Sequence, residues 1–225
     1  MTFRQLGLCS QITKACDDKG YKSPTKIQEE AIIHLLRKRD LLAIAKTGTG
    51  KTAAFVLPIL QDIENQKRKS TDENVVLTKL IIAPTRELVL QLEKSIESYS
   101  KYLDIKKCSV FGGANIKPQI KRLDARVHIV VATTGRLLDL IRQDKINVTK
   151  VDTLILDEAD SMLDMGFVSD IQDILEKLTN LQQTILCSAT LGPNIKKLSS
   201  EIMVNPKIIE IKSNDRVNDK IEQVA

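Results

Sequence analysis

The residues of this chain best suited to chemistry form one short run, AKTGTGKT, at positions 45–52. An apolar run at 41–44 precedes it and indicates a buried strand, and residues 53–57 are typical of the start of a helix. A strand, a glycine turn and a helix in this order are the context that a phosphate-binding loop requires. Gly48 and Gly50 permit backbone conformations that a Cβ atom would obstruct, so successive N–H groups can point at phosphate oxygens. We therefore expect this run to hold a nucleoside triphosphate.

The last two residues of the run have separate expected tasks. Lys51 supplies a positive charge for the outer phosphates, and the Thr52 hydroxyl is placed to bind Mg²⁺. The helix expected to begin near Lys51 adds the positive end of its dipole and its unpaired N–H donors. Ala45 stands where the motif usually has its first glycine. The expected nucleotide contacts in the run are Ala45, Lys46, Thr47, Gly48, Thr49, Gly50, Lys51 and Thr52.

A second run, DEAD at 157–160, follows another apolar stretch at 153–156. A phosphate-binding loop needs a carboxylate on a neighbouring strand, where that strand runs out toward the ligand, to position the metal. Asp157 is the expected partner of the metal, through a water molecule. Glu158 is the candidate for polarising the attacking water. The expected catalytic residues are thus Lys51, Asp157 and Glu158.

Together these two motifs resemble the DEAD-box family of ATP-dependent RNA helicases. Residues 20–28, GYKSPTKIQ, look like the adenine-reading Q motif of that family, with Gln28 as the reader. Phe3 matches the upstream aromatic residue, and Phe3 or Tyr21 would supply apolar or stacking surface. Residues 164–167, DMGF, are most similar to the bacterial RhlE-type branch. The resemblance covers essentially the whole chain and implies an enzyme that uses ATP and Mg²⁺ to separate short RNA duplexes.

Three further segments, at 84–86, 112–113 and 133–136, occur in the same order as the motifs with which this family faces RNA. Glycine N–H groups and arginine guanidiniums suit phosphate oxygens, and none of these residues is an obvious reader of bases, so RNA binding should be independent of sequence. Ser188 and Thr190 match the motif that links ATP hydrolysis to strand separation, and their hydroxyls could bond to Asp160. The residues implied to bind RNA are Pro84, Thr85, Arg86, Gly112, Gly113, Thr133, Gly135 and Arg136.

One position departs from the family pattern. Thr134 stands where the family usually has proline, a residue that suits the first position of a helix. Thr133 can still act as N-cap, so we expect the helix to form with a less rigid start.

Composition bounds the class of protein. The chain has 225 residues, with 42% hydrophobic residues, 3% aromatic residues and no Trp, which favours one large α/β domain with an Ile, Leu and Val core. The net charge of +5 permits nucleic-acid binding without requiring it. No stretch is long and apolar enough for a membrane span, and the four cysteines show no metal-binding or disulfide spacing. We expect a soluble, cytoplasmic monomer that does not contact membranes.

Short apolar runs alternate with helical patterns along the chain. This alternation predicts a mostly parallel sheet covered by helices on both faces, and the resemblance names it a RecA-like P-loop domain. Ligands bind beyond the carboxyl ends of the strands in such sheets, which is where the motifs begin. The expected strands are 41–45, 80–83, 108–111, 128–132, 153–157, 184–188 and 208–211.

Two polar segments are expected to lie outside this pattern. Residues 66–74 are charged and aperiodic, which indicates a solvated loop, with an RNA-gripping basic loop as the alternative. Residues 1–211 would form the ATP-binding domain, and 212–225 resemble the start of a linker to a second RecA-like domain. Family members carry that second domain, which supplies arginines to the ATP site, and nothing in this sequence corresponds to it. This piece alone should therefore hydrolyse ATP poorly.

Two other functions compete with this interpretation. A GTPase is suggested by residues 149–152, TKVD, which resemble a guanine-reading motif, although they precede the metal-carboxylate strand instead of lying on a later one. A nucleotide-dependent RNA or protein interaction module, without catalysis of its own, is the second alternative. Competition between ATP and GTP would exclude the first, and a reading frame that continues past Ala225 would bear on the second.

Overall fold

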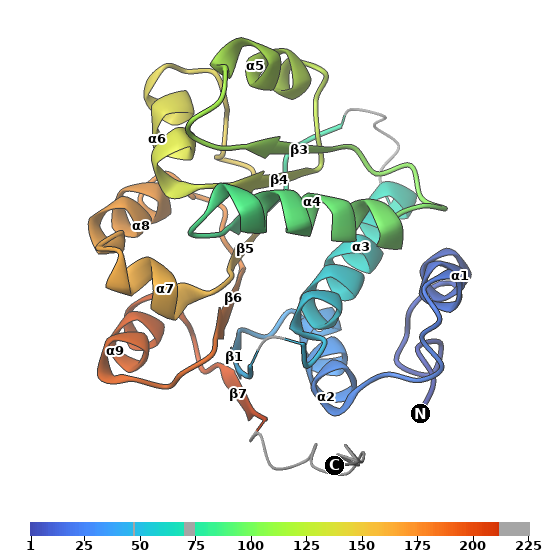
Figure 1. Ribbon diagram of the computed structural model, residues 1–225. Coiled ribbons are helices and arrows are strands. Elements are labelled where there is room, and N and C mark those ends of the chain that lie inside the picture. The colour runs from blue at the N-terminus through green and yellow to red at the C-terminus, as the bar shows by residue number, and fades with distance from the viewer. Residues whose placement is uncertain (47, 70–74, 212–225) are drawn as a thin grey trace, which may run out of the picture.

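The computed structural model describes residues 1–46, 48–69 and 75–211 and forms one sheet flanked by helices (Figure 1). Thr47 of the expected phosphate loop, residues 70–74 and the expected linker at 212–225 lie outside the described residues. All seven expected strands are present within one residue of their expected bounds. The strands are β1 Leu41–Ile44, β2 Lys79–Ile82, β3 Lys107–Val110, β4 Ile129–Ala132, β5 Thr153–Leu156, β6 Gln183–Ser188 and β7 Lys207–Glu210.

The helices lie between these strands and before the first of them. The expectation of a loop at 66–74 is wrong for its first four residues, because α3 continues through Lys69. The side chain of Gln66 lies against the protein there and donates to Asp152 Oδ2 at 2.8 Å. The helices are α1 Ser10–Asp18, α2 Lys26–Leu36, α3 Lys51–Lys69, α4 Arg86–Tyr99, α5 Ile116–Asp124, α6 Thr134–Arg142, α7 Ala159–Asp164, α8 Val168–Leu175 and α9 Pro193–Ile202.

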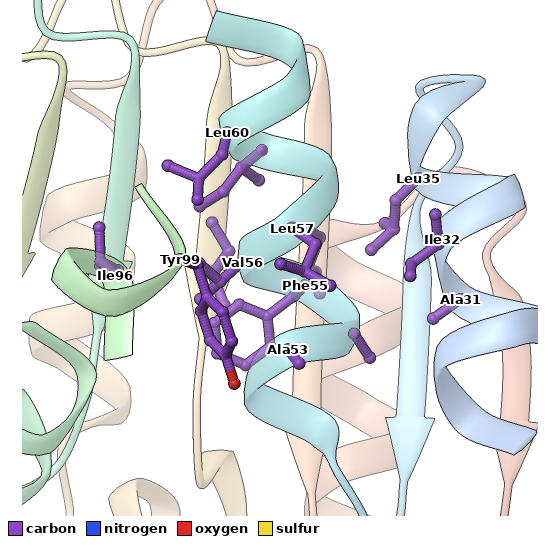
Figure 2. Packing of buried hydrophobic residues seen from close by; sticks show 14 of the residues in the cluster. Ala31, Ile32, Leu35, Ala53, Phe55, Val56, Leu57, Leu60, Ile96 and Tyr99 are labelled. Carbon is purple, nitrogen blue, oxygen red and sulfur yellow. The ribbon is translucent and has the colours of Figure 1, made fainter. Parts of the chain in front are cut away.

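Alternate residues of each central strand pack into two separate hydrophobic clusters, one on each face of the sheet. In β2, Ile81 joins the cluster under α1 to α4, and Leu80 and Ile82 join the cluster under α5 to α9. Figure 2 shows α3 between α2 and α4, with Phe55 and Leu57 among its buried side chains. A strand buried on both faces favours apolar residues at successive positions, which explains why the middle of each of these strands is a continuous apolar run in the sequence. The fold is the expected RecA-like α/β sheet with helices on both faces.

The order of strands in the sheet separates two groups of motifs. The order is β3-β4-β2-β5-β6-β1-β7, and all the described pairings are parallel. The carboxyl ends of β3, β4 and β2 carry the residues expected to face RNA. The carboxyl ends of β5 and β1 carry residues expected to bind the nucleotide or its metal, and the end of β6 carries Ser188 and Thr190, which are expected to couple hydrolysis to strand separation. Because all strands run in one direction, both groups lie at the same edge of the sheet, side by side.

Candidate nucleotide and RNA site

The phosphate loop has the expected strand, turn and helix geometry. Ala45 is buried at the end of β1 and donates its N–H to Ser188 O at 3.0 Å. Gly48 and Gly50 have φ angles of +83° and +93°, in the left-handed region that side chains rarely adopt. The turn is held internally by Thr49, whose hydroxyl donates to Lys46 O at 2.9 Å. Helix α3 begins at Lys51, as the sequence predicts, so its N–H donors face the ligand side of the turn.

Lys51 is the strongest sign that this site binds an anion. Its side chain is buried, and within the described residues the ammonium nitrogen has no hydrogen-bond partner. A buried ammonium without a partner is costly, so the site is suited to an anion that the protein itself does not supply. Lys51 lines a pocket of about 440 Å³, together with residues of the loop, of the DEAD run and of α4.

Asp157 and Glu158 line the same pocket. Burial raises the pKa of the Asp157 carboxyl to about 6, and the positive charge of Lys51 offsets part of that rise. The Glu158 backbone takes a left-handed conformation, with φ of +53°, and its N–H donates to Asp157 Oδ1 at 3.1 Å. A residue other than glycine in this region carries a strain of about 1–3 kcal/mol. The strain sits at the residue whose carboxylate is expected to polarise the reacting water.

The sequence argument assumed that Asp157 follows a strand next to the strand of the phosphate loop. That assumption is wrong, because the two strands are not adjacent. Strand β6 lies between β5 and β1. The reason is topological, because motifs reveal the order of strands along the chain and not their order across the sheet. The consequence is that Ser188 and Thr190, at the end of β6, lie between the two halves of the nucleotide site.

The expected contact between Thr190 and Asp160 is present. Asp160 Oδ2 accepts from the Thr190 hydroxyl at 3.2 Å and from the Thr190 N–H at 3.1 Å. The N–H of Ala189 donates to the same oxygen at 3.0 Å. The expected bond from Ser188 to Asp160 is absent, because the Ser188 hydroxyl donates to Thr190 O at 2.7 Å instead. Ser188 thus closes the turn that presents these donors.

Gln28 lies against the phosphate loop. Its Oε1 accepts the Thr25 N–H at 2.9 Å, which completes a capping box at the start of α2. Its Nε2 donates to Gly50 O at 3.2 Å, and the Thr25 hydroxyl donates to Thr49 O at 3.1 Å. A Cβ atom on Gly50 would lie 2.5 Å from Gln28 Nε2 and would displace that side chain, and the φ of +93° also favours glycine there. One N–H and one lone pair of the amide make no bond within the described residues, although Gln28 is buried and does not line the pocket.

The aromatic residues expected near the nucleotide form one cluster. The rings of Phe3 and Tyr21 are stacked with centroids 6.3 Å apart. Phe3 is buried, and Tyr21 lines the pocket, where its hydroxyl lies 2.8 Å from that of Tyr99. The sequence analysis did not predict that α4 contributes residues to the lining of this pocket. Gln91, Ser95 and Tyr99 of α4 also line the pocket, as does Lys19 after α1, and no motif in the sequence identifies them.

The residues expected to face RNA lie around the ends of β2, β3 and β4. Thr85 is the N-cap of α4 and accepts the Leu88 N–H at 3.3 Å. Arg86, Gly112, Gly113 and Gly135 are exposed, whereas Pro84 is buried and presents no side-chain surface to a ligand.

Two of these segments meet at the loop after β3. The guanidinium of Arg86 lies 4.9 Å from the centre of the Phe111 ring. Arg136 Nη2 donates to Ala114 O at 3.0 Å, and its buried Nη1 has no hydrogen-bond partner within the described residues. Like Lys51, Arg136 therefore carries donor capacity that this part of the protein does not use.

Helix α6 forms with Thr134 at the position where the family usually has proline. Thr134 is the first residue of α6 and is buried. Thr133 occupies the N-cap position with extended backbone, as expected, but its side chain makes no capping hydrogen bond.

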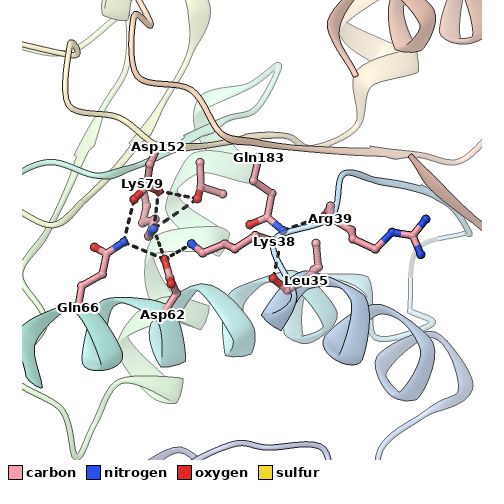
Figure 3. A network of polar contacts seen from close by, with 9 residues as sticks. Leu35, Lys38, Arg39, Asp62, Gln66, Lys79, Asp152 and Gln183 are labelled. Carbon is pink, nitrogen blue, oxygen red and sulfur yellow. Dashed lines mark hydrogen bonds and ion pairs between the residues drawn. The ribbon is translucent and has the colours of Figure 1, made fainter. Parts of the chain in front are cut away.

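Asp152, which a GTPase would use to read guanine, lies in a different part of the molecule. It belongs to a buried network at the amino ends of the strands, opposite the phosphate loop (Figure 3). Lys79 Nζ lies 2.5 Å from Asp152 Oδ1 and also pairs with Asp62. The Asp152 carboxylate is buried and bonded to these partners, so it is not available to bind a base. The geometry therefore gives the GTPase alternative no support.

The described residues offer no other obvious chemistry. No cluster of three or more His, Cys, Asp or Glu side chains there could hold a metal ion. The cysteines Cys9, Cys16, Cys108 and Cys187 are free thiols, and burial raises the pKa of Cys187 well above its ordinary value. In the same part of the chain, every helix is too short or too polar to cross a membrane.

Known proteins resemble this chain over nearly its whole length. The family described as DEAD/DEAH box helicase matches residues 25–198. An ATP-dependent RNA helicase CshA of Limosilactobacillus reuteri is 39% identical over 223 residues, covering 99% of this chain and 44% of that protein. A DEAD-box ATP-dependent RNA helicase CshA of Streptococcus pneumoniae is 38% identical, with 99% and 41% covered. The chain thus spans about two fifths of the length of these curated relatives, and their name does not support the expected RhlE-type branch.

Solved structures show the same fold. A DEAD box protein from the hyperthermophile Methanococcus jannaschii superposes with a TM-score of 0.86 at 37% identity, covering 95% of this chain and 57% of that one. A hypothetical ATP-dependent RNA helicase from Sulfolobus tokodaii gives a TM-score of 0.80 at 37% identity, covering 89% and 56%. The phosphate loop, the DEAD run at 157–160 and the parallel sheet agree with these comparisons. The match over residues 25–198 shows that this chain belongs to the DEAD/DEAH box helicase family.

Proposed function

We propose that this chain is the ATP-binding part of an ATP-dependent RNA helicase that separates short RNA duplexes. The observation that carries the proposal is the buried Lys51 ammonium, which has no partner within the described residues and lines a pocket beside Asp157 and Glu158. A triphosphate is the anion that a glycine-rich turn before a helix is suited to hold.

The donor set of the pocket fits Mg²⁺. Thr52 contributes a hydroxyl and Asp157 a carboxylate, and both line the same pocket. Mg²⁺ prefers oxygen ligands and is usually held through one or two carboxylates, phosphate oxygens and several waters. When bound, the metal neutralises charge that develops on the phosphates. Thr52 would bind it directly and Asp157 through a water.

Glu158 and Lys51 would act at different stages. Lys51 would hold the outer phosphates in the ground state, and the Glu158 carboxylate would accept a proton from the water that attacks the terminal phosphate. The left-handed backbone at Glu158 places that residue in the pocket wall beside Asp157. Gln28 would contribute to adenine recognition with the donor and acceptor capacity that its protein contacts leave.

RNA would bind across the ends of β2, β3 and β4 through its backbone. Arg86 and Arg136 carry charge, and the exposed glycines at 112, 113 and 135 leave room for close approach of the strand. Contacts of this kind read phosphates and not bases, so binding should not depend on sequence.

The full activity would require a second RecA-like domain of the same protein. The curated relatives are more than twice the length that this chain covers. Arginines supplied to the nucleotide from a second domain accelerate related phosphoryl transfers by ~10³–10⁵, so residues 1–225 alone should hydrolyse ATP slowly. The free thiols fit the reducing cytoplasm that we propose as its location, and we propose that it acts as a monomer.

Two variants test this proposal. Lys51→Ala should weaken ATP binding strongly, because the ammonium meets the ground-state phosphates. Glu158→Gln should leave binding nearly unchanged and suppress hydrolysis when the chain is joined to a second domain. Fluorescent ATP titration and phosphate release measure the two quantities. Lys177→Ala, which removes an exposed lysine outside the pocket, is the control.

Equal losses of ATP affinity in the Lys51 and Glu158 variants would contradict these roles. Hydrolysis that survives Glu158→Gln in the two-domain protein would remove the assignment of the attacking water. Full binding with no hydrolysis in the two-domain wild type would instead favour an interaction module without catalysis.

A further inference from the structure

Gln119 is a buried glutamine on α5 that no motif or proposed role so far includes. Its side chain is 5% exposed. Its Oε1 accepts the Phe111 N–H at 3.0 Å, and its Nε2 donates to Phe111 O at 3.2 Å and to Asn115 O at 3.3 Å. One amide therefore bonds to the backbone at both ends of the loop 111–115, which connects β3 to α5.

This loop carries the glycine doublet of the proposed RNA face. Gly112 and Gly113 are exposed, and nothing lies within 4 Å of where a Cβ atom would be on either residue. Gly113 also has a φ of +70°, in the left-handed region. Because the glycines have no side chains to pack, the direction of their N–H groups depends on how the ends of the loop are fixed. Gln119 fixes both ends.

The same loop supports the two arginines proposed to bind RNA phosphates. Arg86 extends from α4 over the ring of Phe111, and Arg136 reaches from α6 to the carbonyl of Ala114. Among the described residues neither arginine forms an ion pair with a carboxylate, so this loop provides the main support of both side chains. A displacement of the loop would therefore move the partners of both guanidiniums together with the glycine N–H groups.

We infer that Gln119 is a positioning residue for RNA binding, which holds the loop 111–115 so that Arg86, the glycine doublet and Arg136 present their donors to one RNA backbone. The inference rests on the proposed RNA role of this face. Gln119 does not itself touch RNA, since its amide is buried under the loop.

A second buried glutamine provides the matched control. Gln183 is 2% exposed, and its Nε2 donates to Leu35 O at 3.1 Å and Arg39 O at 2.8 Å. Figure 3 shows it near the network around Lys79, and as the first residue of β6 it lies at the amino end of its strand, away from the proposed ligand edge. Substitution of either glutamine by leucine removes buried hydrogen bonds from the side-chain amide to the backbone, so both variants should lose stability.

The experiment compares Gln119→Leu, Gln119→Glu and Gln183→Leu in the chain of residues 1–225. RNA affinity is measured by fluorescence anisotropy with a labelled single-stranded oligouridylate at several salt concentrations, next to ATP affinity and thermal stability. Gln119→Leu should weaken RNA binding about three- to tenfold and lower the salt slope by ~0.7 for each RNA phosphate that the variant no longer neutralises. ATP affinity should stay unchanged. Gln119→Glu keeps the acceptor for Phe111 N–H but places a carboxylate against the carbonyl oxygens of Phe111 and Asn115, so its RNA affinity should fall as well. Gln183→Leu should bind RNA like the wild type.

Wild-type RNA affinity and salt slope in both Gln119 variants would overturn the inference. Equal losses of RNA affinity in the Gln119→Leu and Gln183→Leu chains would overturn it as well, because a general loss of stability would then explain the result. Arg86→Ala and Arg136→Ala separate this failure from that of the proposed RNA face. If both arginine variants bind RNA like the wild type, both the proposed RNA-binding face and the role of Gln119 are wrong. If the arginine variants weaken RNA binding and the Gln119 variants do not, only the role of Gln119 is wrong.

Discussion

Asp160 accepts both the backbone N–H and the hydroxyl of Thr190 through a single carboxylate oxygen, at 3.1 and 3.2 Å. Asp157 and Asp160 both follow β5, and Thr190 follows β6, which is adjacent to both β5 and β1. The pair therefore joins the end of the strand proposed to bind the metal to the strand that borders the phosphate loop. A change in the bound nucleotide at either strand would reach this contact.

We expect this contact to matter more for strand separation than for hydrolysis. Thr190→Val keeps the shape and the N–H but removes one of the bonds to Asp160, whereas Asp160→Ala removes the acceptor altogether. In a protein that also has the second domain, the number of duplexes separated per ATP hydrolysed should fall modestly in the first variant and strongly in the second. Ser200→Ala, which removes an exposed hydroxyl that bonds to Lys197 O within α9, is the comparison. An unchanged ratio in Asp160→Ala would show that the contact does not couple the two processes.

Gln28 should affect phosphates as well as the base. Because Gln28 Nε2 bonds to Gly50 O in the phosphate loop, Gln28→Ala should weaken binding of inorganic tripolyphosphate as well as ATP. The preference for ATP over GTP should also be lost, since the free donor and acceptor of the amide are proposed to read adenine. Thr25→Val removes the bond to Thr49 O and should weaken tripolyphosphate without altering base preference.

Calorimetric titration with the three ligands separates the two roles of Gln28. Unchanged tripolyphosphate affinity would exclude the effect on the loop, and unchanged selectivity would exclude adenine reading.

The buried network around Lys79 should contribute to the free energy of unfolding and should not affect the preference between ATP and GTP. Lys79 is fully buried and pairs with Asp62 and Asp152, so Lys79→Met leaves the Asp152 carboxylate without its ammonium partner and Asp62 with Lys38 alone. Removing one partner of a buried ion pair costs about 3–5 kcal/mol, which chemical denaturation would measure. Asp152→Asn should be destabilising too, with the preference between ATP and GTP unchanged in the folded protein. A gain in GTP preference there would revive the guanine-reading role of residues 149–152.

His128 should make stability fall on mild acidification. Burial lowers the pKa of His128, and nearby Lys67 acts in the same direction. Its neutral Nδ1 accepts the Lys106 N–H at 3.0 Å. A depressed pKa in the folded state means that the unfolded chain binds the proton more readily, so stability is present above a pH of about 6.5 and declines as the pH falls below it.

The control for this pH dependence is His128→Asn, whose amide oxygen can take the place of Nδ1 and does not titrate. Thermal unfolding from neutral to mildly acidic pH should show a smaller decline in the variant than in the wild type. The same decline in both proteins would assign the effect to other groups. His34 is one of these, since burial lowers its pKa as well.

The sequence by itself determined the strands, the starts of α3 and α6 and the chemistry of the loops. Strands buried on both faces favour apolar residues at successive positions, and a phosphate loop needs glycines at 48 and 50, so both features are local and visible in the chain. Thr25 and Gln28 also form a capping box that sequence alone can reveal. The extension of α3 through Lys69 was missed, because Gln66 and its neighbours are polar and their partners lie far along the chain.

Only the tertiary structure decided how these local elements meet. The order of strands across the sheet places β6 between β1 and β5, and no local pattern encodes that order. The partners of Gln119 and Arg136, the unpaired ammonium of Lys51 within the described residues and the burial of Lys79 likewise depend on residues brought together by packing. Periodicity and motifs report what each segment does with its own neighbours, whereas long-range contacts are fixed when the two hydrophobic faces of the sheet are covered.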